Sequence, residues 1–158
     1  NVFYDKIDMD KIGITGHSQG GIGAINAVTE QKHSDIYKAA VILSSTETDA
    51  AKALLWDSDS SLIKTNTLMI ASNGAADLKI SPLDSLMKTY NNISNDVSKV
   101  LAIRNDCDHG EMLYYADGYV TAWFMHYLKG DTEAGKAFFG ENTEINSNPL
   151  YQDVQVHK

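Results

Sequence analysis

Gly16-His17-Ser18-Gln19-Gly20 is the stretch around which the sequence is organised. It follows an apolar run at 11–15 and leads into small and apolar residues at 21–27, which predicts a strand, a tight turn and a helix in succession. A serine at the apex of such a turn presents its hydroxyl above the end of a sheet. Glycine is expected at 16 and 20 because a Cβ at either position would collide with the backbone. The pattern predicts a nucleophile elbow with Ser18 as the nucleophile.

Two other interpretations of the glycines fit less well. A phosphate-binding loop ends in Gly-Lys-Ser/Thr, and no lysine lies nearby. A dinucleotide-binding loop needs Gly-x-Gly-x-x-Gly, whereas Gly21-x-Gly23 is followed by Asn26. A structural turn with an incidental serine remains the alternative to the elbow.

Composition predicts one globular domain spanning 1–158, since 43% of the 158 residues are hydrophobic and 22% are charged. A formal net charge of -8 argues against nucleic acid or an anionic membrane surface as a partner. The sequence contains neither an apolar run of membrane-spanning length nor the pattern of a signal peptide. We therefore expect a soluble protein without a transmembrane segment, and cytoplasmic and exported locations both stay open.

Strands and helices are predicted to alternate along the chain. Short apolar runs predict strands at 11–15, 37–44, 67–71 and 99–104. Helices are expected at 20–32, 81–92 and from the loop at 105–110 to about Leu128, with short ones at 50–56 and between Asp131 and Gly140. Residues 141–158 are expected to form a polar tail. This alternation predicts an α/β fold, a doubly wound and mainly parallel sheet with helices on both faces.

Two further residues are placed near Ser18 by this layout. Asp77 follows the third strand and His109 follows the fourth, and reacting groups gather at the carboxyl ends of parallel strands. Ser18 would attack, His109 would take and return the proton, and Asp77 would orient the imidazole and stabilise its cation. The sequence predicts a Ser18, Asp77, His109 catalytic triad.

Other histidines and the lone cysteine are weaker candidates. His17 adjoins the nucleophile but is expected to point away from it as a packed histidine. The remaining histidines are expected in a helix or in polar ends: His126, His33 and His157. Cys107 lacks an elbow and is expected to be a small buried residue.

Acidic residues around His109 leave two alternatives open. Asp106 or Asp108 could pair with His109, although loop acids are usually solvated or turn-forming. A metal cluster would have to use Asp106, Asp108, His109 and Glu111. Their spacing matches no standard zinc or calcium pattern, so no metal site is expected.

Several segments together resemble one family. They are residues 16–21, 71–77, 81–82, His109, 118–123 and 128–131. These segments resemble the dienelactone-hydrolase, lipase and cutinase-like branch of bacterial α/β-hydrolases, and the resemblance covers only the latter part of that family's domain, from the elbow strand onward. It implies hydrolysis of small-molecule or lipid carboxylic esters through an acyl-enzyme, without a cofactor.

The sequence departs from this branch in three places. The aromatic residue that polyester-degrading relatives carry after the strand following the elbow is absent from 44–47, so polymer activity is not implied. The elbow residue is Ser18, whereas true dienelactone hydrolases have Cys. The C-terminal disulfide of secreted members is missing.

The oxyanion hole is expected to be incomplete in this chain. One donor would be the backbone N–H of Gln19, but the second comes from a loop preceding the elbow strand, outside this sequence. The elbow strand, with Ile12 and Ile14, is expected to be an open sheet edge. It would pair with an N-terminal fragment, a second chain or another copy of itself. Beside a serine esterase, an acyltransferase with the same triad and a non-catalytic fragment completing a hydrolase sheet remain open.

Overall fold

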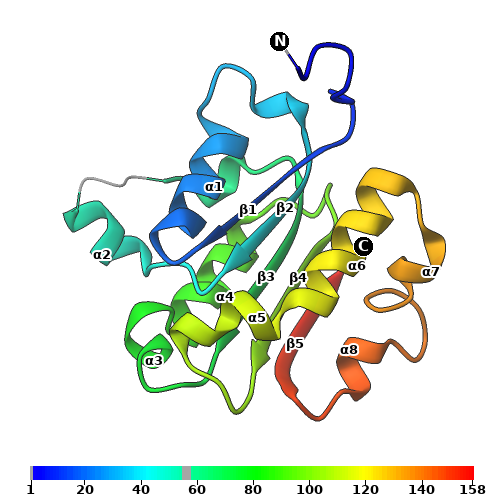
Figure 1. Ribbon diagram of the computed structural model, residues 1–158. Helices are drawn as coiled ribbons and strands as arrows, with labels where there is room; N and C mark the ends of the chain where they lie inside the picture. The colour runs from blue at the N-terminus through cyan, green and yellow to red at the C-terminus, as the bar shows by residue number, and fades with distance from the viewer. Residues whose placement is uncertain (1, 55–57) are drawn as a thin grey trace.

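A computed structural model describes residues 2–54 and 58–158, which form a five-stranded sheet in the order β1-β2-β3-β4-β5. The strands are β1 (Ile12–His17), β2 (Tyr37–Leu43), β3 (Asn66–Ser72), β4 (Lys99–Arg104) and β5 (Tyr151–His157). The first four run parallel, and β5 pairs antiparallel with β4 (Figure 1). The predicted mainly parallel sheet is confirmed.

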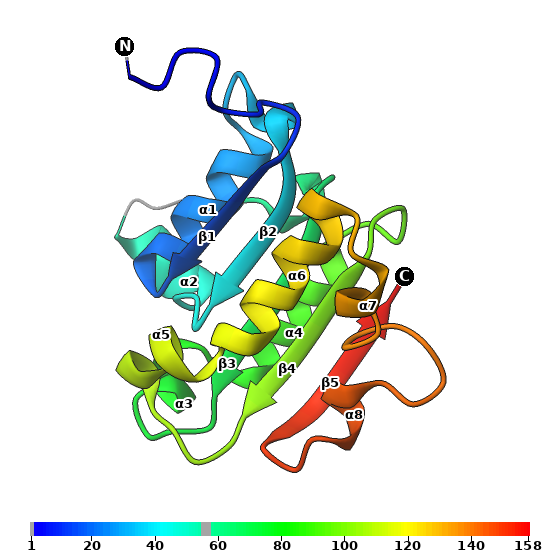
Figure 2. The same ribbon diagram turned by 45° about the vertical axis from the view of Figure 1, so that its right-hand side comes forward.

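Helices cover both faces of the sheet (Figure 2). They are α1 (Gln19–Thr29), α2 (Thr48–Ala53), α3 (Asp77–Ile80), α4 (Leu83–Asn92), α5 (Met112–Tyr115), α6 (Asp117–Lys129), α7 (Thr132–Gly135) and α8 (Glu144–Ser147). Short 3-10 helices span Ser34–Ile36, Ser60–Leu62 and His109–Glu111. Helices α1 and α4 pack on one face and α6 on the other. This arrangement explains the continuous apolar runs of the parallel strands, whose two faces are both buried.

Two separate apolar clusters form the core, and neighbouring strand residues belong to different ones. Ile42 packs toward α1 and α4, where Ile25 and Leu86 lie. Val41 packs toward α6, against the fully buried Trp123. Successive side chains of a strand point to opposite faces, so each strand contributes to both clusters.

The helix boundaries differ from the prediction in two places. Helix α4 begins at Leu83, two residues later than the expected start at 81, and Ser81 is instead the C-cap of α3. The long helix expected up to Leu128 is divided into a 3-10 turn, α5 and α6. The division falls at Ala116, next to Asp117 and Gly118, and both of these residue types are weak helix formers. Of the short helix expected at 50–56, residues 55–56 lie outside the described residues.

The expected polar tail is wrong, because residues 141–158 contain α8 and β5. Tyr151 and Val154 pack against the cluster beneath α6. The rest of β5 is largely exposed, since the strand lies at the edge of the sheet. A half-exposed edge strand carries few apolar residues, so its sequence resembles that of a polar segment without regular structure.

Within residues 2–54 and 58–158, the structure contains no helix with the length and apolar character needed to cross a bilayer.

Candidate active site

Ser18 lies at the apex of a sharp turn between β1 and α1. Its backbone has φ 58° and ψ -123°, a strained conformation for a residue other than glycine. The Ser18 N–H donates to the carbonyl oxygen of Leu43 at 2.9 Å, and its own carbonyl oxygen accepts from Gly21 N–H at 2.9 Å. These bonds to β2 and to the first turn of α1 hold the strained residue in place. The chain thus makes a sharp turn from strand to helix at the position of the predicted elbow.

The two elbow glycines have different surroundings. A Cβ on Gly16 would overlap the backbone carbonyl of Gly20, so only glycine fits there. A Cβ on Gly20 would meet nothing within 4 Å, and the expectation of crowding at this position is wrong. Gly21 is the second crowded position, since a Cβ there would lie 2.9 Å from that of Ser45. The chain approaches itself closely behind Gly16, whereas Gly20 faces open space.

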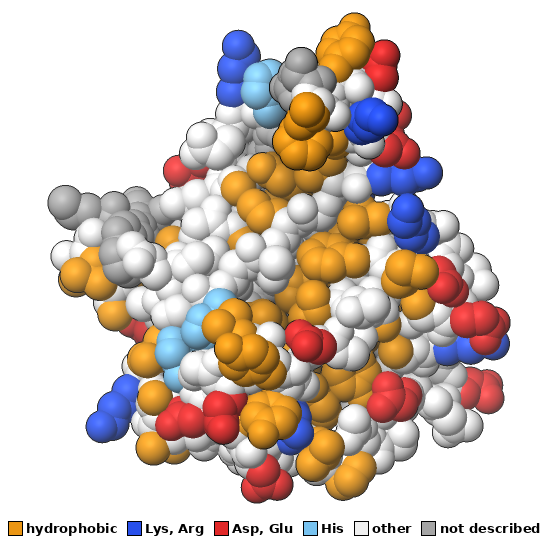
Figure 3. All heavy atoms as spheres, in the orientation of Figure 1, with side chains coloured by type: hydrophobic (Ala, Val, Ile, Leu, Met, Phe, Trp, Pro, Cys, Tyr) orange, Lys and Arg blue, Asp and Glu red, His pale blue; other side chains and the backbone are white. Residues whose placement is uncertain are grey.

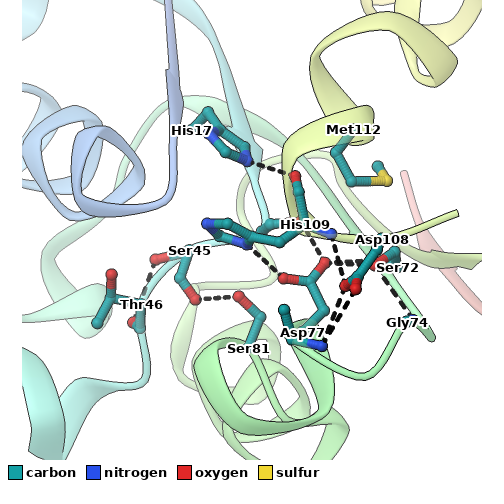
Figure 4. Close-up of polar contacts among 12 residues, drawn as sticks. His17, Ser45, Thr46, Ser72, Gly74, Asp77, Ser81, Asp108, His109 and Met112 are labelled. Carbon is teal, nitrogen blue, oxygen red and sulfur yellow. Dashed lines mark hydrogen bonds and ion pairs between the residues drawn. The ribbon is translucent and has the colours of Figure 1, made fainter.

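Asp77 is fully buried at the start of α3, just after β3. Its Oδ2 accepts hydrogen bonds from Ser44 Oγ at 2.5 Å, Ser72 Oγ at 2.7 Å and Ser72 N at 2.8 Å. Its Oδ1 lies 2.6 Å from Nδ1 of His109 (Figure 4). Burial by itself raises the pKa of the Asp77 carboxyl, but these hydrogen bonds outweigh burial and hold the pKa below its ordinary value. Asp77 is therefore a carboxylate at neutral pH, pointed at His109.

His109 begins the 3-10 helix after β4 and is held through ring and backbone. With Nδ1 directed at a carboxylate, the ring carries its proton on Nδ1 when neutral, and Nε2 stays available as a base. The backbone N–H donates to Oδ1 of Asp108 at 2.7 Å. The carbonyl oxygen accepts from Nε2 of His17 at 2.8 Å, and the two imidazole rings lie 4.5 Å apart. His17 thus packs against His109.

The relation between Ser18 and His109 is indirect in this structure. Among the described residues, no hydrogen bond joins the Ser18 hydroxyl to the imidazole of His109. His17, which precedes Ser18 directly, does contact His109. The turn at Ser18 and the loop that carries His109 are therefore neighbours through His17.

The acidic residues near His109 have separate places. Asp108 caps the 3-10 helix, and Glu111 accepts a hydrogen bond from the Asp108 N–H. Asp106 is exposed, with φ 56°. Within the described parts of the chain, no three His, Cys, Asp or Glu side chains are grouped so that they could hold a metal ion.

Cys107 and the other histidines lie in different surroundings. Cys107 is buried with its Sγ 3.5 Å from Sδ of Met112, and burial raises the pKa of its thiol, which disfavours the reactive thiolate. His126 is paired with the carbonyl of Asp131, and His157 with the carbonyl of Asn95.

Sequence reasoning missed Ser44 and Ser72, the hydroxyl donors to Asp77. Each stands at the carboxyl end of a strand, Ser44 directly after β2 and Ser72 as the last residue of β3. The feature in the sequence was a serine at the end of each apolar run. It could have been recognised, because a buried carboxylate at that edge needs donors.

Large hydrophobic side chains are exposed next to these loops. Leu78 follows Asp77 directly and is 64% exposed, while Leu113 and Tyr114 on α5 are 50% and 74% exposed. The space-filling view shows histidine side chains at the surface beside hydrophobic ones (Figure 3). Exposed apolar patches often mark binding surfaces.

No protein-family model and no curated protein matches the chain. Solved structures do match. Acylaminoacyl peptidase in complex with Z-Gly-Gly-Phe-chloromethyl ketone is 18% identical with a TM-score of 0.63, covering 92% of this chain and 27% of that one. Pyrococcus horikoshii acylaminoacyl peptidase in its orthorhombic form is 18% identical with a TM-score of 0.64, covering 90% and 27%. Its uncomplexed form is 21% identical with a TM-score of 0.59, covering 79% and 25%.

This chain spans about a quarter of the length of those proteins. TM-scores of 0.59 to 0.64 establish a shared fold, and at identities of 18% to 21% the likeness shows the fold alone. Together with the parallel sheet and the sharp turn at Ser18, they show that the chain has the α/β-hydrolase fold.

Proposed function

We propose that this chain carries the nucleophile, base and acid of a serine hydrolase that cleaves carboxylic esters. The observation that carries the proposal is the 2.6 Å contact between Nδ1 of His109 and the fully buried Asp77 carboxylate. A buried carboxylate that orients an imidazole in a loop next to the Ser18 turn supports acyl transfer by serine.

The first half of the reaction forms an acyl-enzyme. Ser18 Oγ attacks the ester carbonyl carbon as its proton passes to Nε2 of His109, and the carbonyl oxygen becomes an oxyanion. Asp77 stabilises the imidazolium that results. When the intermediate collapses, the carbon–oxygen bond to the alcohol breaks and His109 returns the proton to the departing alcohol. Ser18 is then esterified by the acyl group.

The second half repeats these steps with water as the nucleophile. His109 takes a proton from water as the water oxygen attacks the acyl carbon, and returns it to Ser18 Oγ as the carboxylic acid leaves. Gln19 contributes its backbone N–H to the oxyanion, since the first N–H groups of a helix have no partner within the helix.

The substrate is proposed to be an ester with an apolar acyl or alcohol group. The exposed Leu78, Leu113 and Tyr114 support this choice, because they follow Asp77 and His109 closely in the chain. Fully burying an exposed leucine side chain is worth about 1.5–3 kcal/mol, so Leu78 and Leu113, which are already partly buried, would contribute a fraction of that against substrate.

A second candidate is hydrolysis of an amide bond to an acylated amino acid. The likeness to acylaminoacyl peptidase, one of whose structures holds a peptidyl chloromethyl ketone, favours it. The same three residues would act, with an amine as the leaving group.

Labelling with a fluorophosphonate probe tests the nucleophile. Folded wild-type chain is expected to become labelled at Ser18, and Ser18→Ala is expected to lose the label. Ser45→Ala is the matched control. Alanine keeps the Cβ that lies close to Gly21 and removes only the hydroxyl, so this variant should still be labelled at Ser18. Absence of label on folded wild type would contradict the proposal.

Turnover of an activated ester and of an N-acylated amino-acid anilide separates the two candidates. A higher kcat/KM for the ester, growing as the acyl chain lengthens from acetyl to hexanoyl, is the expected result. A clear preference for the anilide would favour the second candidate instead.

The edge of β1 is also part of the proposal. No strand pairs with its outer side among the described residues, and the fold takes its second oxyanion donor from a loop that precedes the elbow strand. We propose that a further strand pairs along β1, supplied by an N-terminal fragment, a second chain or another copy of this one, and that rates stay about 10²- to 10³-fold lower without the second donor. Light scattering over a concentration series tests the pairing, and a strictly monomeric chain with full activity would contradict it.

A further inference from the structure

Asp108 joins the two loops that carry Asp77 and His109. Its Oδ1 accepts the backbone N–H of His109 at 2.7 Å (Figure 4). The same Oδ1 accepts the backbone N–H of Ala76 at 3.1 Å, and Oδ2 lies 3.4 Å from the Ala76 nitrogen. Ala76 directly precedes Asp77. The Asp108 carboxylate therefore accepts the backbone N–H of His109 and the backbone N–H of Ala76, the residue next to Asp77.

The two loops also touch at this point. A Cβ added to Gly74 would lie 2.6 Å from the Cα of Asp108, so the loop after β3 lies directly against the loop after β4. Only a residue without a side chain fits at 74. This close approach is what brings the Ala76 N–H within reach of a side chain as short as that of Asp108.

A second link lies nearer the strands. Asn73 N–H donates to the carbonyl of Arg104 at 3.1 Å, and its side chain donates to Asn105 at 2.9 Å. Asn73 and Asn105 join the loops where they leave β3 and β4. Asp108 joins them beside the acid and base, where a small displacement changes the 2.6 Å contact directly.

We propose that Asp108 is a positioning residue, whose carboxylate sets the distance between Asp77 and His109 by holding the backbones of both loops. The expected effect of Asp108 on the reaction rate rests on the proposed function. Its effect on the distance between Asp77 and His109 does not. The alternative is that Asp108 serves only as the cap of the short helix at His109–Glu111. A cap alone would stabilise the loop without affecting the hydrogen bond between His109 and Asp77.

Three variants of the full chain separate these roles. Asp108→Ala removes both acceptors. Asp108→Asn keeps one oxygen and remains a good cap, but it turns an NH2 group or a neutral oxygen toward Ala76. Asp106→Asn is the matched control, since it makes the same change of charge two residues away at an exposed position.

The first measurement is the far-downfield proton resonance of His109 Nδ1–H, assigned by its loss in His109→Asn. Asp108→Ala is expected to lose or shift this resonance, Asp108→Asn to shift it less, and Asp106→Asn to leave it unchanged. This readout does not depend on turnover. It therefore tests Asp108 even if the chain hydrolyses no ester.

The second measurement is ester hydrolysis. Asp108→Ala is expected to lower kcat about 10- to 100-fold with little change in KM, since a charge-assisted hydrogen bond is lost away from the substrate. Asp108→Asn should recover part of this loss, and Asp106→Asn should stay within about twofold of wild type.

An unchanged resonance and kcat in folded Asp108→Ala would overturn the proposal and leave Asp108 as a helix cap. If Asp108→Ala does not fold, Asp108→Asn decides, and a resonance identical to that of Asp106→Asn would overturn it. A resonance that is lost in Asp108→Ala while wild type shows no turnover supports the positioning role and contradicts the proposed hydrolase.

Discussion

The elbow and the acid–base pair are held in different ways. The elbow is built from consecutive residues, and its geometry depends on an absent side chain at Gly16 and on the strained backbone of Ser18. The pair of Asp77 and His109 joins residues 32 apart, and it depends on hydroxyl groups supplied by the ends of β2 and β3.

This difference predicts how each region fails. Adding atoms should damage the elbow, because the chain contacts itself too closely to admit them. Removing polar atoms should damage the pair, because a buried carboxylate loses the donors that make its burial tolerable. Substitutions in the two regions test this contrast.

The largest effect is expected from Asp77→Asn. An amide in place of the carboxylate can stabilise the wrong tautomer of His109, and a loss in kcat of about 10⁴-fold is expected for a triad of this kind. Steady-state hydrolysis of an activated ester measures it. A loss below tenfold in folded protein would mean that His109 works without Asp77.

Gly16→Ala comes next. The added Cβ would overlap the backbone of Gly20, and overpacking of this kind costs about 3 kcal/mol of unfolding free energy. Urea denaturation followed by circular dichroism gives the change in stability. An unchanged midpoint would show that the elbow is looser than its geometry implies.

Ser44→Ala removes one donor to Asp77 and keeps the Cβ. A charge-assisted hydrogen bond is worth about 2 kcal/mol, and its loss also raises the pKa of Asp77. Because the folded pKa of Asp77 lies below its ordinary value, the stability it contributes is present above about pH 4 and is lost as pH falls through the folded pKa.

The stability gap between wild type and Ser44→Ala should therefore be largest above about pH 4 and shrink at lower pH. Urea midpoints from pH 7 down to pH 3 measure this gap. A gap that widens toward acid would contradict the assignment.

Gly20→Ala should have the smallest effect, in the opposite direction. Gly20 lies in the first turn of α1 with open space around its Cα, so alanine should stabilise the helix by up to about 1 kcal/mol. It is the direct counterpart of Gly16→Ala, and equal destabilisation by both substitutions would remove the distinction between the two glycines.

Much of the fold was predictable because its signals are local. Each parallel strand is covered on both faces, so the runs around Val41 and Met69 are continuously apolar and easily found. The edge strand β5 was missed because only part of it is buried, with Tyr151 and Val154 facing the core. The break at Ala116 was missed because the apolar spacing continues across it.

The sequence by itself determined the elbow at Ser18, since its geometry follows from the order of neighbouring residues. It also determined that Asp77 and His109 follow strands of a parallel sheet, which brings them to one edge. Only the tertiary structure decided which side chains hold them there: Ser44, Ser72 and Asp108. The physical reason is that hydrogen bonds between loops depend on the spacing and register of packed strands, which the residues of no single segment specify.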